Sequence, residues 1–305
     1  MMRNYCCAIF IALLVLSGCG SGDGDSRVLA WGSRGGIKGK FASPRAIDVY
    51  ENFVYVADRV GRVQKFDLQG NYILEWRIEP YKVGTASSLS VDQNGDVWVP
   101  DTHNQRILHF NADGELLSSF GEKGEGPGQL GFPIAITFGK NGELYITEYS
   151  INDRVQVFSR DGEYLNISWG EHGDGEEQFN RPMGIALGPD GLLYVADAIN
   201  HRIKVYTTEG KLVRNIGERG KGPGYLQFPY DIDIDKEGNL YIAEFGNHRI
   251  QKMNSEGASL GVWGSPGSAK GQLVDPWGAA VDGGMFYIAD TKNHRIQAGP
   301  VSLIK

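Results

Sequence analysis

Residues 179–217 read FNRPMGIALGPDGLLYVADAINHRIKVYTTEGKLVRNIG, and this stretch decides the fold. Turn signals separate four short apolar runs, and the middle two runs are rich in the β-branched and aromatic residues typical of strands. Gly191 and Gly210 can supply the positive φ that tight hairpin turns need. We therefore expect a four-stranded antiparallel meander, with strands at Gly184–Leu187, Leu192–Ala196, Ile203–Tyr206 and Leu212–Ile216.

The same pattern recurs along the chain in steps of 43 to 49 residues. The second strand of each unit ends in a carboxylate, and a proline precedes the first strand in every unit except the second, which has Ala86. Units of about 40–50 residues with four strands each are typical of propeller blades. The carboxylates that mark the six predicted blades are Asp58, Asp101, Glu148, Asp197, Glu244 and Asp290.

The turn between the second and third strands carries a family resemblance. Asn200-His201-Arg202-Ile203, Asn247-His248-Arg249-Ile250 and Asn293-His294-Arg295-Ile296 resemble the NHL repeat, and weaker copies lie at 61–63, 104–107 and 152–155. The resemblance covers the chain from about residue 27. It implies an all-β, six-bladed β-propeller of four-stranded antiparallel blades whose faces bind other molecules. It does not fix a chemistry, because one fold hosts many functions.

The two ends of the propeller are predicted to meet in one blade. Residues Val28–Gly32 and the text after them resemble Leu260–Gly264, which we expect to form a fourth strand. The last unit has no fourth strand of its own, because the chain ends soon after Ile296. We therefore expect residues 28–32 to complete the sixth blade, which would close the ring and remove open sheet edges.

The N-terminal segment predicts export. Arg3 precedes an unbroken apolar run at Ala8–Leu16, which suits a signal peptide and is too short to span a bilayer. Leu16-Ser17-Gly18-Cys19 resembles the bacterial lipobox, which implies cleavage before Cys19 and a lipid on that cysteine. The alternative is an ordinary secretory signal followed by an unrelated cysteine.

The chain then divides into a lipoprotein signal peptide at 1–18, a flexible tether at 19–26 and an NHL-repeat β-propeller at 27–305. We expect a lipid-anchored monomer of the bacterial cell envelope, and the absence of an aspartate directly after Cys19 favours the outer membrane. The other cysteines, Cys6 and Cys7, lie in the signal peptide, so the propeller has no disulfide and no thiolate ligand. Without Arg3 the chain has 29 Lys and Arg against 37 Asp and Glu, and this net charge of about −8 argues against a nucleic-acid partner.

Arginines and histidines recur in the turns after the second strands. An arginine opens each third strand four to six residues after the carboxylate, and we expect partly exposed Arg–carboxylate pairs, each worth about 1 kcal/mol. We place the four turn histidines at one shared position of different blades. Because these turns diverge and zinc needs its nitrogen ligands within about 2.1 Å, we predict no metal site there. The histidines are His103, His201, His248 and His294.

The candidate ligand-binding surface is the rim of the central channel, on the face where the second strands end. The residue after each blade proline stands at this rim, and aromatic surface with a few polar groups is typical of recognition sites. Met183 and Ile134 fit either ligand contact or packing between blades, whereas we expect Tyr230 and Trp277 to be exposed. The predicted rim residues are Arg45, Tyr149, Met183, Tyr230, Asp231, Phe245 and Trp277.

Two functions are compatible with these residues. The favoured one is a membrane-anchored, non-catalytic binding module that binds a protein, peptide or glycan through one propeller face, without a cofactor. The alternative is a metal-dependent propeller enzyme, of lyase or lactonase type, with an axial site. The peptide-amidating lyases, which resemble NHL repeats, hold zinc through axial histidines, and the expected inner strands contain no histidine. Lactonase-type propellers hold calcium through axial carboxylates, and Asp48, Asp231 and Asp233 are few for an ion with about 6–8 ligands.

Overall fold

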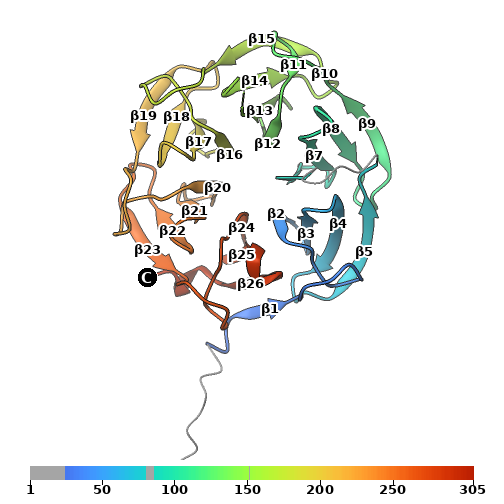
Figure 1. Ribbon diagram of the computed structural model, residues 1–305, viewed down its shortest axis with the longest axis vertical. Helices are drawn as coiled ribbons and strands as arrows, with labels where there is room; N and C mark the ends of the chain where they lie inside the picture. Colours follow the sequence, from blue (N-terminus) through green and yellow to red (C-terminus); the bar gives the residue numbers. More distant parts are fainter. Residues whose placement is uncertain (1–24, 80–85, 151) are drawn as a thin grey trace, which may run out of the picture.

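Six four-stranded antiparallel sheets stand around a central axis in the computed structural model, which describes residues 25–79, 86–150 and 152–305 (Figure 1). This confirms the predicted all-β, six-bladed propeller. The signal peptide at 1–18, Cys19 and most of the tether lie outside the described residues. In these three ranges no helix is long and apolar enough to cross a membrane.

Each blade runs from an inner strand beside the axis to an outer strand at the periphery (Figure 1). The first three blades are β2 (Pro44–Tyr50), β3 (Phe53–Asp58), β4 (Arg62–Asp67) and β5 (Tyr72–Arg77); β6 (Ser90–Val91), β7 (Val97–Asp101), β8 (Arg106–Phe110) and β9 (Leu116–Phe120); and β12 (Pro133–Phe138), β13 (Leu144–Glu148), β14 (Arg154–Phe158) and β15 (Tyr164–Trp169). A short parallel pair, β10 (Glu122–Lys123) and β11 (Gln129–Leu130), connects the second blade to the third.

The other three blades follow the same order along the chain. They are β16 (Pro182–Leu187), β17 (Leu193–Asp197), β18 (Arg202–Tyr206) and β19 (Leu212–Ile216); β20 (Pro229–Ile234), β21 (Leu240–Glu244), β22 (Arg249–Met253) and β23 (Ser259–Trp263); and β24 (Ala279–Asp282), β25 (Met285–Asp290), β26 (Arg295–Pro300) and β1 (Leu29–Trp31). Two 3₁₀ turns, η1 (Thr291–Asn293) and η2 (Val301–Leu303), flank β26.

The N-terminal strand closes the ring, as the sequence predicts. β1 pairs antiparallel with β26, with Leu29 opposite Ala298 and Trp31 opposite Ile296, and so forms the outer strand of the sixth blade (Figure 1). The Trp31 ring also lies 6.1 Å from the Phe66 ring of the first blade, measured between centroids. Strand pairing and side-chain packing together therefore join the two ends of the propeller.

The core lies between the blades. The middle strands β17 and β18 are buried along almost their whole length, because each face of a blade packs against a neighbouring blade. The outer strand β19 alternates between half-buried and exposed positions and is buried only at its last residue, Ile216. A hydroxyl group adds a contact between blades; Thr147 of β13 donates a hydrogen bond to the carbonyl oxygen of Met183 in β16 of the next blade at 2.8 Å.

An arginine is paired with the second-strand carboxylate in every blade. In the fourth blade Arg202 Nε donates to Asp197 Oδ2 at 2.8 Å, and its guanidinium also donates to carbonyl oxygens of Gly175 and Gln178 in the loop that leads into the blade. The pairs are Arg62–Asp58, Arg106–Asp101, Arg154–Glu148, Arg202–Asp197, Arg249–Glu244 and Arg295–Asp290.

The predicted pairing is confirmed, and the expected partial exposure applies to arginines such as Arg106 and Arg202 but not to the carboxylates. All six carboxylates are fully buried, because the loop before each blade folds over the turn and hides it from solvent. Burial raises the pKa of Asp197, and hydrogen bonds from Asn180, Asn200 and Arg202 oppose that rise. Breaking such a buried pair costs more than breaking a surface pair, because one charge remains desolvated without its partner.

We expect the Asp197→Asn substitution to lower the free energy of unfolding by about 3 kcal/mol, because it leaves Arg202 without a buried counter-charge. Chemical denaturation at pH 7 measures the change. The exposed Asp174 in the preceding loop provides the matched control, and Asp174→Asn should change stability by less than about 0.5 kcal/mol. Equal effects of the two substitutions would show that the pair does not stabilise the blade.

Candidate functional site

The turn histidines connect neighbouring blades. Nδ1 of His201, His248 and His294 accepts a backbone N–H of the following blade at 3.0, 3.1 and 3.0 Å, respectively. The donors stand just before the first strands and have positive φ values; they are Phe228, Asp275 and Ser43. A positive φ is uncommon for residues other than glycine, and the hydrogen bond from the N–H to the imidazole stabilises the backbone in that conformation. Each imidazole is therefore used in a contact between two blades.

His103 does not share this position, and the prediction that it does is wrong. Its counterpart in the second blade is Gln105, whose φ of 57° matches the 58° of His201 and which likewise precedes the arginine of the turn. His103 lies two residues earlier and its ring contacts Phe132 at 6.1 Å. Alignment on histidine alone placed it incorrectly; the spacing to the arginine gives the correct equivalence.

A pocket of about 180 Å³ opens at the rim of the channel. We call it the channel-mouth pocket. Five of the six blades contribute to it, because the ends of their inner strands and the turns after their second strands converge on the axis. Arg45, Tyr149 and Trp277, three of the predicted rim residues, line it. The complete lining is Arg45, Arg59, Ser87, His103, Ile134, Tyr149, Arg181 and Trp277.

Two predicted rim residues lie beneath the surface. Met183 and Tyr230 are 1% and 7% exposed, so the expectation of an exposed Tyr230 is wrong. The Tyr230 ring stacks on Phe245 at 4.6 Å and meets the Trp277 ring edge-on at 4.7 Å, which covers it. Met183 belongs to the same buried cluster as Ile134 and serves packing between blades. Phe245 and Trp277 remain half-buried above this cluster.

The arginines of the pocket lie on aromatic rings. The Arg45 guanidinium carbon lies 4.2 Å from the centroid of Trp277, and that of Arg181 lies 5.5 and 5.3 Å from Tyr149 and Tyr230. Nε of Arg45 and of Arg181 is buried and has no hydrogen-bond partner among the described residues. Burial, followed by repulsion from Arg59 and Arg181, lowers the pKa of Arg45 to about 10. The pocket therefore combines concentrated positive charge with rigid aromatic support.

Below the mouth, the channel widens into an axial cavity of about 230 Å³ that contains three carboxylates. Asp231, a predicted rim residue, lines this cavity with Asp48 and Asp233. Burial raises the pKa values of Asp48, Asp231 and Asp233 to about 7, 8 and 6; repulsion from Asp233 adds to the rise for Asp48 and Asp231, and repulsion from Asp282 and Asp235 adds to it for Asp233. The axis is thus cationic at the mouth and acidic below it.

The axial cavity does not fit the metal site that the enzyme alternative requires. The Asp48, Asp231 and Asp233 carboxylates each accept a backbone N–H of the next blade, at 2.7, 3.1 and 2.6 Å. Their oxygens are therefore used in joining the inner strands. Among the described residues that line the cavity none is a histidine, and these carboxylates do not form a cluster with ligand-to-ligand spacing. Calcium would need about 6–8 oxygen ligands in this space.

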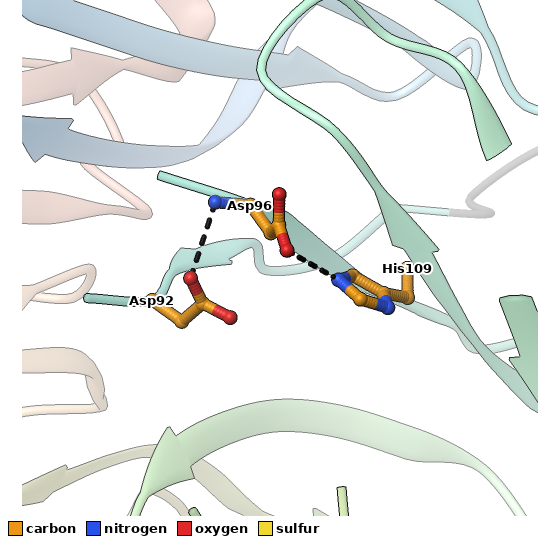
Figure 2. Close-up of side chains that lie close together, drawn as sticks. All are labelled: Asp92, Asp96 and His109. Atoms are coloured by element: carbon orange, nitrogen blue, oxygen red, sulfur yellow. Dashed lines mark hydrogen bonds and ion pairs between the residues drawn. The ribbon is translucent and has the colours of Figure 1, made fainter. Parts of the chain in front are cut away.

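Within the described chain, the side chains with metal-ligand spacing are Asp92, Asp96 and His109, whose ligand atoms lie within 4.8 Å of one another (Figure 2). Figure 2 shows the Asp96 carboxylate directed at His109 Nε2, at 2.9 Å, and Asp92 directed at the Asp96 backbone. Asp92 also pairs with Arg160 of the third blade and accepts a hydrogen bond from Trp98 Nε1. The group is thus a network of hydrogen bonds and ion pairs that ties two blades together.

Comparison with known proteins agrees with the architecture. A family model described as a 6-bladed beta-propeller matches residues 187–260, and the NHL repeat model matches residues 273–298. The chain carries an NHL repeat within a six-bladed β-propeller. A propeller of this kind can serve either as a binding module or as an enzyme. The fold alone does not decide between the two roles.

Curated relatives share only part of their length with the NHL-repeat propeller. Protein brain tumor of Drosophila melanogaster is 31% identical over 80 residues, which are 26% of this chain and 8% of that protein. Human NHL repeat-containing protein 3 is 29% identical over 92 residues, which are 29% of this chain and 26% of that protein. The solved structure of a streptogramin B lyase aligns over 90% of this chain and 98% of its own, with a TM-score of 0.65 and 18% identity, a likeness of fold alone.

Two arginines of the pocket were missed in the sequence. Arg59 follows the carboxylate of the first blade, and Arg181 precedes the proline of the fourth. Arg59 occupies the position after the carboxylate at which Tyr149 and Phe245 were placed at the rim, so this equivalence could have found it. Arg181 lies two residues before Met183, on the other side of the proline. Arg181 approaches Arg45 because the inner ends of the first and fourth blades converge on the axis, which the local sequence does not encode.

We expect His201 to make stability fall in acid. Burial lowers its pKa below the ordinary 6.5, so the folded state favours the neutral imidazole that accepts the Phe228 N–H. The stabilisation is present above pH 6.5 and decreases as pH falls below it, because the unfolded chain binds the proton more readily. The His201→Asn variant keeps an acceptor oxygen without this titration, and asparagine tolerates the positive φ.

The test is chemical denaturation of both proteins between pH 7.5 and pH 5. As the pH falls, the wild type should lose more stability than His201→Asn, so the difference between their free energies of unfolding should change in favour of the variant. The axial carboxylates titrate in both proteins and cancel in the difference. A difference that is constant with pH would mean that the imidazole does not act as a neutral acceptor.

Proposed function

We propose that this protein is a lipid-anchored binding protein of the bacterial cell envelope, and that its channel-mouth face binds a protein, peptide or glycan without catalysis. The channel-mouth pocket supports this proposal. It is concave, it is formed by residues of five blades, and it combines half-buried Trp277 and Tyr149 with guanidinium groups that have no ion-pair partner among the described residues. Such a combination of aromatic surface and convergent polar groups is typical of recognition sites.

The rigidity of the pocket also favours binding. Its residues belong to strand ends and to turns that the buried Arg–carboxylate pairs and the histidine contacts hold in place. Little ordering of side chains is then needed when a ligand binds, which reduces the entropic cost of association. The alternative of a metal-dependent lyase or lactonase lacks a ligand set in the axial cavity, as described above. We therefore favour binding over catalysis.

The anchor is the second part of the proposal. Cys19 follows Leu16-Ser17-Gly18, and the residues between it and β1 are rich in glycine and polar side chains, which is typical of a flexible tether. A tether would let the propeller face a partner in the envelope while the lipid remains in the membrane. Outer-membrane placement is favoured because no aspartate follows Cys19.

Cell fractionation tests the anchor. In a Gram-negative host the wild type should be found in the membrane fraction, and Cys19→Ser should lose this association because the lipid has no thiol to join. Cys7→Ser, which alters a cysteine inside the signal peptide, is the matched control and should stay with the membrane. Membrane retention of Cys19→Ser would contradict the lipidation proposal.

Affinity capture from envelope extracts tests the face. We expect Trp277→Ala to reduce recovery of the bound protein, peptide or glycan at least tenfold, because aromatic anchors carry much of the energy of recognition. Tyr225 is 48% exposed in a loop outside the pocket, and Tyr225→Ala is the control that should leave recovery unchanged. Thermal unfolding verifies that both variants are folded. Equal recovery by Trp277→Ala and wild type would rule out this face.

A further inference from the structure

We propose that the channel-mouth pocket is an oxyanion site, in which Arg45, Arg59 and Arg181 together bind a phosphate or carboxylate group of the ligand. This inference rests on the proposed function and specifies the ligand's chemistry. The three guanidinium groups line one pocket of about 180 Å³, a volume suited to a small anionic group rather than to a whole ligand.

The first argument is the absence of counter-ions. The arginines that open the third strands each form an ion pair with a buried carboxylate. By contrast, the side chains of Arg45, Arg59 and Arg181 form no ion pair and donate no hydrogen bond to any described residue. The gaps at 80–85 and 151 contain no Asp or Glu that could supply a partner. A guanidinium has five N–H donors, so the pocket has a large unused donor capacity.

The second argument is the way in which the charges are held. Arg45 lies over Trp277 at 4.2 Å, and Arg181 lies over Tyr149 at 5.5 Å, so the ring faces support the guanidinium groups. Cation–π contacts contribute attraction without occupying the N–H donors. The groups are thus positioned before the ligand arrives, and planar guanidinium groups match the oxygens of phosphate and carboxylate in bidentate pairs.

The third argument concerns electrostatics. Burial and repulsion from the neighbouring arginines disfavour the charged form of Arg45 and lower its pKa to about 10. An anion would relieve that repulsion on binding. The axial carboxylates lie deeper along the same strands; Arg45 lines the mouth, whereas Asp48 lines the cavity.

The confinement of the positive charge defines the ligand class. A nucleic acid needs an extended basic surface that follows its phosphates, whereas the full chain carries a net charge of −7. A pocket with three arginines instead suits a single oxyanion at the end of a ligand or on one of its residues. Two sources share this chemistry: a phosphate group and the carboxylate of an acidic sugar.

Isothermal titration of the full-length protein in detergent tests the inference with two probes, sodium phosphate and sodium glucuronate. Glucose at matched ionic strength is the uncharged control. We expect at least one anionic probe to bind, and Arg45→Gln and Arg59→Gln each to weaken its binding about tenfold or more. Arg77→Gln removes the same charge from an exposed position at the end of β5 and should leave the affinity unchanged. Binding of phosphate alone, or of glucuronate alone, supports the inference and identifies the source.

Three results would overturn the inference. They are an absence of binding by both anions, equal weakening by Arg77→Gln, and retention of full affinity in both Arg45→Gln and Arg59→Gln. Thermal unfolding confirms that the variants are folded, and exposed Arg59 can be replaced with little effect on packing. If Trp277→Ala abolishes partner capture but neither anion binds or competes, the oxyanion inference fails and the proposed function stands. If an anion binds but capture is unaffected, the proposed docking face fails and the oxyanion site stands.

Discussion

A buried ion pair at the same place in every blade is the interaction on which the rest of the structure depends. The carboxylate at the end of the second strand is completely removed from solvent, and the arginine of the third strand is its partner. Desolvation makes such a pair costly unless further hydrogen bonds satisfy both groups. In the fourth blade Asp197 accepts from Asn180 and Asn200 as well, and Arg202 donates to carbonyl groups of the loop that leads into the blade. The pair thus fixes a turn and a loop together.

The positions of the rim residues follow from these fixed turns. The turn histidines accept N–H groups from the next blade just before its proline, so each inner strand begins at a set distance from the preceding turn. In the third blade Asp153 does the same for the Arg181 backbone at 3.1 Å. The backbone of Arg181, whose side chain lines the channel-mouth pocket, is thereby held by the third blade. The channel-mouth pocket is consequently a product of the ring rather than of one blade.

Arginine has two roles in this propeller, which differ in the groups that the guanidinium contacts. The arginines of the repeat are neutralised by buried carboxylates and hold loops in place. Arg45 and Arg181 lie on Trp277, Tyr149 and Tyr230, and aromatic faces leave the N–H groups available. The acidic axial cavity lies beneath them. Cations therefore stand where a ligand can enter, and carboxyl groups whose pKa values are raised by burial stand in the enclosed part of the axis.

The sequence by itself determined the blade count, the blade pairs and the closure. These features depend on local patterns: apolar runs of strand length, glycine turns, the spacing of Arg202 from Asp197, and the likeness of Trp31-Gly32 to Trp263-Gly264. Only the tertiary structure decided what the rim is made of. Tyr230 was expected at the surface, yet it is covered because Phe245 of the same blade and Trp277 of the next blade pack on it. Arg181 of the fourth blade joins Arg45 and Arg59 of the first blade because the inner ends of the blades converge on the axis, and no local spacing in the chain records that distance.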